Sequence, residues 1–313
     1  MEYRQLGDTG LCVSRIALGT VELGMDYGFR GLDRYQRPDP SAAIKIVHRA
    51  LDLGINLIDT ARAYGTSEAL IGKALSERPA NVVVASKVAV PEDTPAEPNR
   101  LREAISSSIE ASLRSLQIET IDLMQIHNFA LSTPKSDGVW RALEDARQAG
   151  KIRFLGASCY GEEAPLTALN DDHINTLQVP FNVLDRRVLP RVFPGAVRRS
   201  VGILTRSAFL RGVLTIHVNS VPEQLAPVRQ AALRVLAVAR EAGQSISETA
   251  LRFCLSFDEV SSVIVGVRSV RELESNVADG DKGALATEVI EQLRQVTVLD
   301  DSLLDPINWR GLI

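Results

Sequence analysis

Cysteine and histidine are scarce in this sequence, which has three cysteines and four histidines among its 313 residues. The cysteines are too few and too scattered for a disulfide framework or a metal knuckle. The histidines show no metal-ligand spacing either, so we predict no metal site. The residues concerned are Cys12, Cys159, Cys254, His48, His127, His173 and His217.

Long apolar runs and an excess of one charge are also missing. No uninterrupted apolar stretch approaches the ~18 residues of a membrane span. The polar N-terminus, MEYRQLGDTG, lacks the apolar core of a signal peptide. A formal net charge of -4 gives no indication of a nucleic-acid or anionic-membrane partner. We therefore expect a cytoplasmic protein that binds neither membranes nor nucleic acids.

The sequence is rich in apolar material, with 45% hydrophobic and 24% charged residues, which is typical of a globular protein with a large core. Short β-rich runs alternate with amphipathic segments. The clearest helical face is formed by Leu101, Ile105, Ile109, Leu113 and Leu116. The expected strands are RIALGT (15–20), INLIDT (55–60), NVVVASK (81–87), IDLMQIH (121–127), IRFLGAS (152–158), TLQVPFN (176–182), VGILTRS (201–207) and SSVIVGV (261–267).

Most of these runs are continuously apolar, as the strands of a parallel sheet covered by helices are. Because no GxGxxG follows any of them, eight βα units favour an α/β fold of the closed (β/α)8 TIM-barrel type over a doubly wound dinucleotide fold. GDTG (7–10) predicts the turn of an N-terminal β-hairpin. No linker divides the sequence, so we predict one domain over 1–313. Extra segments are expected at 25–40, at 217–243 and, as C-terminal helices, after Gly283.

Polar residues stand at the ends of three consecutive strands. Asp59 is expected to close the second strand, Lys87 the third and His127 the fourth, while Tyr64 follows on the next loop. Active sites of such barrels lie where the strands end, and neighbouring strands are about 4.8 Å apart. These four side chains should therefore meet. On that loop, Gly65 would supply backbone freedom, and Thr66 or Ser67 can cap the next helix.

Each of the four residues also has a purely structural interpretation. Asp59 could cap a turn, His127 could be a core histidine with satisfied hydrogen bonds, and Tyr64 could be a surface aromatic. Lys87 lies inside an apolar run, where a buried ammonium needs a partner such as Asp59. Four coincidences at one end of a barrel are less probable than one site, so we favour the functional interpretation.

The grouping indicates proton transfer to a carbonyl oxygen. Lys87 would stabilise the phenolate of Tyr64 and lower its pKa from about 10, and Asp59 would keep Lys87 charged and in place. His127 could orient the substrate oxygen. This set contains neither a nucleophile nor a metal, so another group must attack the carbon, and a nicotinamide hydride is the natural candidate.

The motif DTARAYGTSEALIG (59–72) resembles the first signature of the aldo-keto reductase superfamily. Asp59, Tyr64, Lys87 and His127 match the catalytic tetrad of that superfamily one by one, and the resemblance extends from LGDTGLCVSRIALGT (6–20) to SSVIVGVRSVRELESN (261–276). It implies a (β/α)8 barrel, an extended NAD(P)H with its nicotinamide over the barrel mouth, and hydride transfer to aldehydes or ketones.

The resemblance also implies which residues bind the coenzyme. Ser158 and Gln178 match residues that bind the nicotinamide amide, but Cys159 replaces an asparagine of the family pattern. Arg206 stands where the family usually has an aromatic that stacks under the nicotinamide, and a guanidinium can also stack. The residues implied to contact the coenzyme are Gly19, Thr20, Asp59, Ser158, Gln178, Arg206, Ser207, Phe209, Gly266, Arg268, Glu272 and Asn276.

The choice of coenzyme rests on two residues of VGVRSVRELESN (265–276), a segment that resembles the family's adenosine-phosphate site. Arg268 favours the 2′-phosphate of NADP(H), and the start of the last helix favours an anion. Glu272 would repel that phosphate and suits the free hydroxyl of NAD(H). We favour NADP(H), with NAD(H) as the alternative.

The substrate is expected to be a small carbonyl compound. Specificity should come from the loops at 21–40 and 128–137 and from the tail around Trp309. Few aromatics (5%) and polar loop residues such as Asp26, Arg30 and Asn128 favour a sugar-like or polyol-like carbonyl over a steroid. The oligomeric state and the direction of reaction stay open.

Two alternatives to a carbonyl reductase or alcohol dehydrogenase remain. One is a redox-neutral, epimerase-type enzyme that keeps its coenzyme bound. The other is a cofactor-sensing binding module like the β-subunits of potassium channels. We rank the binding module lower, because those proteins often carry an extension before the hairpin, which here begins almost at residue 1.

Overall fold

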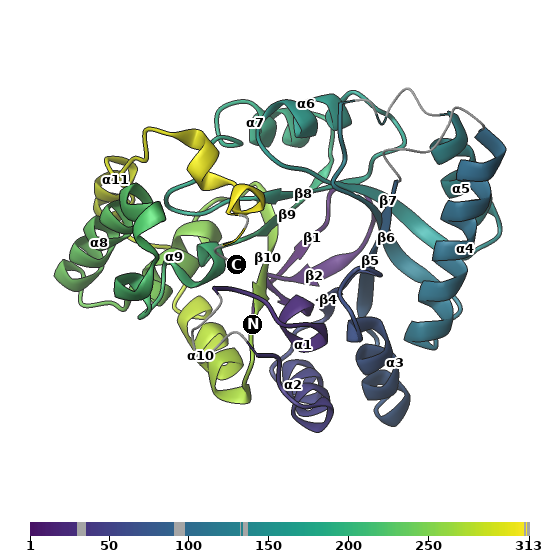
Figure 1. Cartoon of the computed structure of the whole chain (residues 1–313), viewed down its shortest axis with the longest axis horizontal. Coiled ribbons are helices and arrows are strands. Elements are labelled where there is room, and N and C mark those ends of the chain that lie inside the picture. The colour runs from purple at the N-terminus through teal and green to yellow at the C-terminus, as the bar shows by residue number, and fades with distance from the viewer. Residues whose placement is uncertain (30–35, 91–97, 132, 134–136, 310, 312–313) are drawn as a thin grey trace.

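Eight parallel strands form a closed barrel at the centre of the computed structural model, with helices packed around it (Figure 1). The structure describes residues 1–29, 36–90, 98–131, 133, 137–309 and 311. Within these residues the order around the barrel is β10-β3-β4-β5-β6-β7-β8-β9. The barrel strands are β3 (Ile16–Gly19), β4 (Leu57–Asp59), β5 (Val83–Ala89), β6 (Ile121–His127), β7 (Ile152–Ser158), β8 (Thr176–Pro180), β9 (Gly202–Arg206) and β10 (Val260–Gly266).

The eight strands lie where the apolar runs predicted them, with ends that differ by up to two residues, and the (β/α)8 barrel is confirmed. Strand β5 continues to Ala89, so the expectation that Lys87 closes its strand is wrong by two residues. The run Val88–Ala89 pairs with the end of β6, which extends the strand past the lysine.

The helices follow the strands in alternation, and further helices lie in the predicted extra segments. None of the helices in the described ranges is both long and apolar enough to cross a membrane. Their bounds are α1 (Val21–Gly24), α2 (Pro40–Asp52), α3 (Ser67–Glu77), α4 (Pro98–Leu116), α5 (Asp137–Gln148), α6 (Glu163–Leu169), α7 (Val192–Arg198), α8 (Ala226–Glu241), α9 (Ile246–Leu255), α10 (Val270–Gly280), α11 (Thr287–Arg294) and the short 3-10 helices η2 (Leu210–Gly212), η3 (Val218–Ser220), η4 (Glu223–Leu225), η5 (Asp301–Leu304) and η6 (Pro306–Asn308).

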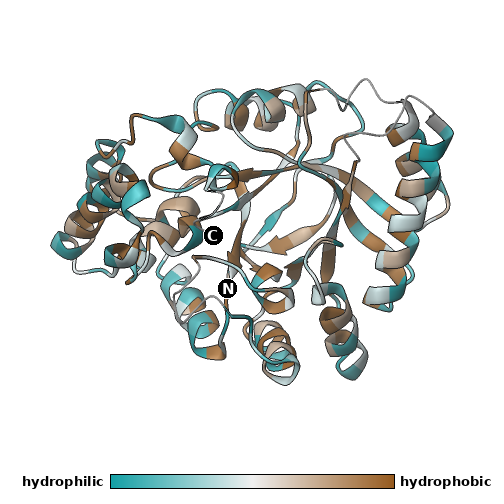
Figure 2. Ribbon diagram, in the orientation of Figure 1, coloured by the Kyte–Doolittle hydropathy of each residue, from teal (hydrophilic) through white to brown (hydrophobic). Residues whose placement is uncertain are grey.

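The long helices bury an apolar face, against the barrel or, as in α8, against neighbouring helices (Figure 2). All five members of the predicted face of α4 are buried, at 0–8% exposure. Helix α2 ends at Asp52, and Gly54 follows it with a φ of +84°, in the left-handed conformation that suits glycine just past a helix end. The apolar spacing and the glycine therefore account for both the orientation and the length of these helices.

The N-terminal hairpin, β1 (Tyr3–Gln5) and β2 (Cys12–Ser14), closes one end of the barrel. Leu6, Leu11 and Val13 of the hairpin pack against Leu57 and Leu204 inside the barrel, in one buried cluster. The opposite end, where the strands finish, is left for polar side chains.

Strand alternation determines which side chains reach that polar end. Residues two positions apart on a strand share a face. The apolar interior cluster includes Ala17, Leu57, Ala85, Leu123, Leu204 and Ile264. The residues two positions later therefore also face the interior, one layer nearer the mouth, and they are Gly19, Asp59, Lys87, Gln125, Arg206 and Gly266.

Gly156 makes room for this interior layer. A Cβ atom at Gly156 would lie 2.4 Å from Thr176 Oγ1 and 3.0 Å from Gln125 Cγ. Thr176 Oγ1 is buried and makes no hydrogen bond within the described chain, so removing it sacrifices no polar contact. The glycine is thus required by the close approach of two neighbouring strands.

We expect Gly156→Ala to lower the free energy of unfolding by about 1–3 kcal/mol, because overpacking forces neighbours to move. In a Thr176→Ala background the same change should cost clearly less, since the nearest clashing atom is gone. Urea unfolding of the four proteins of this double-mutant cycle measures the difference. Equal costs in both backgrounds would contradict the packing argument.

Candidate active site

A buried carboxylate, Asp59, lies at the centre of the polar end of the barrel. Lys87 Nζ donates to Asp59 Oδ2 at 2.6 Å. The side-chain amides of Gln125 and Gln178 both donate to Asp59 Oδ1, at 3.1 and 2.7 Å. Lys87 Nζ also donates to the carbonyl of Thr60 at 2.9 Å. All four side chains are at most 4% exposed, so this network neutralises charges that water cannot reach.

Tyr64 is positioned by a tight turn after β4. Gly65 has a φ of +58°, and a Cβ there would lie 2.5 Å from the carbonyl oxygen of Gly24. Thr66 is the residue before α3, but its side chain donates to the Gly24 carbonyl at 3.2 Å and makes no capping bond. Capping of α3 by the Thr66 side chain, one of two predicted options, is therefore wrong, because the hydroxyl ties the turn to α1 instead.

Tyr64, Lys87 and His127 gather at the mouth as the sequence predicted. Lys87 Nζ lies 4.9 Å from the centroid of the Tyr64 ring. The rings of Tyr64 and His127 are 5.9 Å apart at 86°, an edge-to-face contact. A phenol, an imidazole and a paired ammonium thus surround one point at the barrel mouth.

Burial raises the pKa of the Tyr64 phenol well above its ordinary value, and the negative charge of Asp59 raises it further. Arg206 acts in the opposite direction. The expected net lowering of the Tyr64 pKa is therefore wrong for this structure. The physical reason is that burial is the largest influence on the phenol and disfavours its charged form. Tyr64 is protonated at neutral pH and can donate its proton.

Burial lowers the pKa of His127 to about 4, and the positive charge of Lys87 lowers it further. The imidazole is consequently neutral at pH 7, with one nitrogen that donates a hydrogen bond and one that accepts. This state suits an orienting role better than a charge-stabilising one.

A cavity of about 640 Å³ opens from this point along the mouth of the barrel. Lys87 does not line the cavity, because it lies beneath Asp59 and Tyr64 at 1% exposure. The predicted site residues that do line it are Gly19, Thr20, Asp59, Tyr64, His127, Ser158, Gln178, Arg206, Ser207, Phe209, Gly266, Arg268, Glu272 and Asn276.

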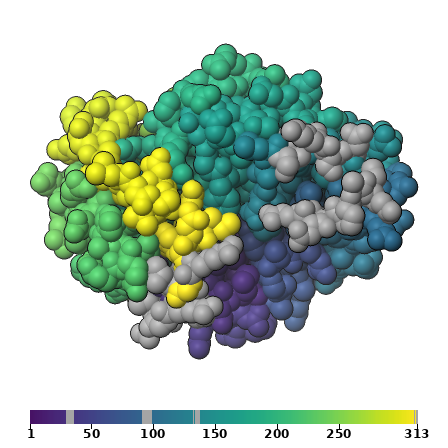
Figure 3. All heavy atoms as spheres, turned by 45° about the horizontal axis from the view of Figure 1, so that its top comes forward, coloured from purple at the N-terminus to yellow at the C-terminus, as the bar shows by residue number. Residues whose placement is uncertain are grey.

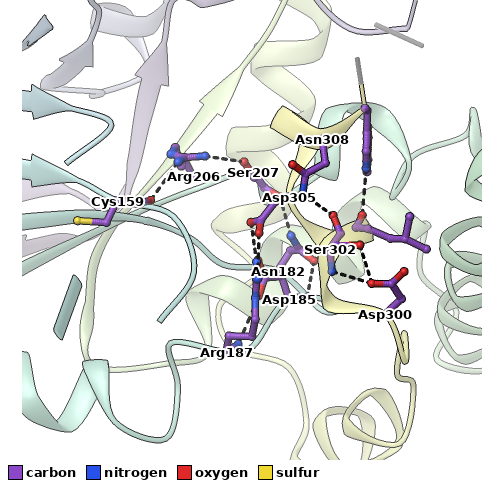
Figure 4. Close-up of polar contacts among 12 residues, drawn as sticks. Cys159, Asn182, Asp185, Arg187, Arg206, Ser207, Asp300, Ser302, Asp305 and Asn308 are labelled. Carbon is purple, nitrogen blue, oxygen red and sulfur yellow. Dashed lines mark hydrogen bonds and ion pairs between the residues drawn. The ribbon is translucent and has the colours of Figure 1, made fainter. Parts of the chain in front are cut away.

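Arg206, at the end of β9, is held in place by a main-chain contact, which Figure 4 shows, and by an aromatic contact. Its guanidinium donates to the carbonyl of Cys159 at 3.1 Å and lies 4.2 Å from the centroid of the Tyr160 ring. The Cys159 thiol is fully buried, and burial raises its pKa to about 12, so the side chain is a small buried hydrophobic group. Arg206 is half-buried and is therefore not a fully solvated charge at the end of its strand.

The far end of the cavity is the start of α10. Ser269 accepts a hydrogen bond from the backbone N–H of Glu272, and the Glu272 carboxylate accepts one from the backbone N–H of Arg268 at 2.9 Å. Glu272 therefore helps to cap the helix. The Arg268 guanidinium donates to the main-chain carbonyl of Tyr27, and the exposed Arg271 lines the same cavity. Arg271 is a second arginine that could bind a phosphate here.

Sequence reasoning missed several residues of this site. Glu22 has a buried carboxylate oxygen with no hydrogen bond in the described chain, and burial raises its pKa. Its carboxylate occupies the space that a Cβ at Gly266 would need, with the nearest atoms 2.2 Å from that position. Strand alternation could have identified Gln125 as an interior residue. The other missed residues are Tyr27, Tyr160, Arg211 and Arg271.

The C-terminal segment supports one wall of the site and crosses the surface toward the N-terminal residues (Figure 3). Arg187 bridges Asp185 and Asp305, with hydrogen bonds of 2.7–3.0 Å (Figure 4). Trp309 is 2% exposed and stacks on Phe29 at 5.5 Å between ring centroids. Phe29 lines the cavity, whereas Trp309 lies behind it. The tail around Trp309 thus reaches the cavity wall through Phe29.

Three polar loop residues are singled out in the sequence, and the structure describes two of them. Asp26 is exposed beside the mouth, and Asn128 lines the cavity. Arg30, which contributed to the expectation of a sugar-like substrate, lies outside the described residues.

Residues 15–298 match the model of the Aldo/keto reductase family, and the chain belongs to this family. An L-galactose dehydrogenase from Arabidopsis thaliana is 30% identical, over 89% of this chain and 88% of that protein. The holo form of aldo-keto reductase AKR11C1 from Bacillus halodurans has a TM-score of 0.77 at 27% identity, covering 95% and 96% of the two chains. The glycerol dehydrogenase AKR11B4 from Gluconobacter oxydans has a TM-score of 0.74 at 29% identity, covering 94% of each.

The family consists of oxidoreductases that use nicotinamide coenzymes, so the resemblance seen in the sequence is confirmed at this level.

The lowered pKa of His127 predicts a pH-dependent loss of stability. Between about pH 6.5 and 4 the unfolded chain binds a proton on this imidazole and the folded chain does not, so the free energy of unfolding falls as the pH falls. We expect His127→Gln to remove this contribution, at most about 1.4 kcal/mol per pH unit. Denaturant unfolding at pH 7 and pH 5 tests this. Between pH 7 and pH 5 the free energy of unfolding should fall less in the variant than in the wild type. Equal falls in the two proteins would contradict the assignment.

Proposed function

We propose that this chain transfers a hydride between a nicotinamide coenzyme and a carbonyl or alcohol carbon, with Tyr64 as the proton donor and acceptor. The observation that carries the proposal is the arrangement of Tyr64, His127 and the Lys87–Asp59 pair at the open end of the barrel. The set supplies a proton and hydrogen bonds to an oxygen, and a coenzyme must supply the reducing equivalent. When bound, a reduced nicotinamide provides the hydride.

Three side chains of the protein have separate roles in the proton transfer. Tyr64 donates its proton to the carbonyl oxygen in the reducing direction and takes it back in the oxidising direction. Neutral His127 donates a hydrogen bond that orients the same oxygen. Lys87 is a positioning residue, fixed by Asp59, whose ammonium faces the Tyr64 ring and stabilises negative charge that develops on the phenol oxygen.

The cavity supports binding of a dinucleotide. It runs from Tyr64 to the N-terminus of α10, an 11-residue helix whose first N–H groups favour an anion. Arg211, Arg268 and Arg271 line it, and the buried Nε atoms of Arg211 and Arg268 make no hydrogen bond within the described residues. Cations and unused donors along one groove fit a ligand that carries several phosphate charges. We favour NADP(H) for this reason, with NAD(H) as the alternative.

The substrate region favours small, hydroxyl-rich carbonyl compounds. Beside Tyr64 and His127 the mouth is lined by Tyr27, Asn128 and Tyr160, whose polar groups can pair with substrate hydroxyls. Two related proteins are named for a sugar and a polyol, L-galactose and glycerol. We therefore propose a sugar or polyol, or the carbonyl compound derived from it, as the substrate class.

Tyr64→Phe should abolish turnover, by at least about 10²-fold, and leave coenzyme binding nearly unchanged, because only the proton donor is lost. Turnover is measured as coenzyme oxidation or reduction across a panel of aldehydes, ketones, sugars and polyols with both coenzymes. A Tyr64→Phe enzyme with near wild-type turnover would refute the assigned role, and a wild type inactive on the whole panel would argue against the substrate class.

Variants of Arg268, Arg271 and Glu272 test the choice of coenzyme. If Arg268 contacts a 2′-phosphate, Arg268→Ala should weaken NADPH binding by roughly 1.5–3 kcal/mol, the range for a charge-assisted hydrogen bond, and leave NADH nearly unchanged. Glu272→Gln, which keeps an acceptor for the helix cap, should tighten NADPH. Arg271→Ala is the matched comparison, and titrations are made at one ionic strength. A wild type that prefers NADH, with no discrimination in Arg268→Ala, would contradict the choice of NADP(H).

A further inference from the structure

Arg206 brings a fixed positive charge to the mouth of the barrel. Its position follows from strand alternation, since Leu204 faces the barrel interior and Arg206 lies two residues later on β9. The guanidinium is anchored by the Cys159 carbonyl, the Tyr160 ring and, at 3.5 Å, the Ser207 hydroxyl. Figure 4 shows the contacts with Cys159 and Ser207, with the Cys159 sulfur turned away from the guanidinium.

This charge is not neutralised by a carboxylate in the described part of the chain. The groups that act most on the Arg206 charge, apart from burial, are the side chains of Tyr160, Tyr64, Tyr27 and Cys159. Lys87 differs in this respect because it is paired with Asp59 at 2.6 Å. Arg206 therefore brings an unpaired positive charge to the point where the cavity meets Tyr64 and His127. It acts to lower the pKa values of both side chains, although Asp59 has the larger effect, in the opposite direction.

The neighbours of Arg206 place it beside any nicotinamide that serves Tyr64. The ends of β7, β8 and β9 are adjacent in the barrel, so Ser158, Gln178 and Arg206 form a continuous rim of the same cavity. Gln178 also contacts Asp59, which connects this rim to the proton donor. A nicotinamide ring that reacts with a carbonyl held by Tyr64 and His127 must lie against this rim.

We propose that Arg206 makes the site discriminate between the redox states of the coenzyme and bind the reduced form more tightly. This inference rests on the proposed function. An oxidised nicotinamide ring carries a positive charge and a reduced ring carries none, so a nearby fixed cation repels only the oxidised ring. The phosphates are the same in both forms, and their contacts cancel in the ratio of the two dissociation constants.

The test is a set of calorimetric titrations with NADPH and NADP⁺, without substrate and at one ionic strength. Arg206→Gln should lower the ratio Kd(NADP⁺)/Kd(NADPH) by at least about fivefold relative to the wild type, because the repulsion of the oxidised ring is removed. Arg206→Met, a second neutral variant, should show the same fall, and Arg206→Lys should largely retain the wild-type ratio. The matched control is Arg198→Gln, an exposed arginine at the end of α7 that loses the same charge and should leave the ratio unchanged.

Two results would overturn the inference in distinguishable ways. If the neutral variants weaken or strengthen both coenzyme forms equally, Arg206 has no role in redox discrimination, although the proposed function stands. If the folded wild type binds neither redox form of NADP(H) nor of NAD(H), the proposed function fails, and the inference fails with it.

Discussion

The site depends on the neutralisation of one almost completely buried carboxylate, that of Asp59. Asp59 takes an ammonium on one oxygen and two amides on the other, from strands β5, β6 and β8. Removing any donor would leave part of a buried charge uncompensated, which is costly in a low-dielectric interior. The same contacts join four strands of the barrel at its open end. Stability of the barrel mouth and placement of Lys87 beside Tyr64 are therefore two results of one network.

That network also determines the electrostatics of the site. Burial is the largest influence on the pKa values of Tyr64 and His127 and keeps both side chains neutral at pH 7, while Asp59 and Lys87 act on His127 in opposite directions. The phenol is therefore protonated, and Arg206 has no carboxylate partner among the described residues. The paired ammonium of Lys87 lies beneath the cavity, whereas the guanidinium of Arg206 lines it.

The fold was predictable from the sequence because continuous apolar runs of strand length, separated by amphipathic helices, have few arrangements open to them. Asp59, Tyr64 and His127 were predictable because strand ends converge in a barrel. Gln125 was missed, since a glutamine inside an apolar run gives no sign of its partner. The raised pKa of Tyr64 and the Arg268–Tyr27 contact depend on burial and on distances between remote segments, which residue order does not contain.

Met1 and Trp309 lie toward opposite ends of the barrel. The hairpin closes the end away from the site, and the Met1 amino group pairs with Asp281 just after α10. Trp309, near the other terminus, packs behind a wall of the cavity. Immobilisation on a solid support through the Met1 amino group would therefore leave the barrel mouth facing solution, whereas attachment at the segment that contains Trp309 would bring the support close to the Phe29 wall of the cavity.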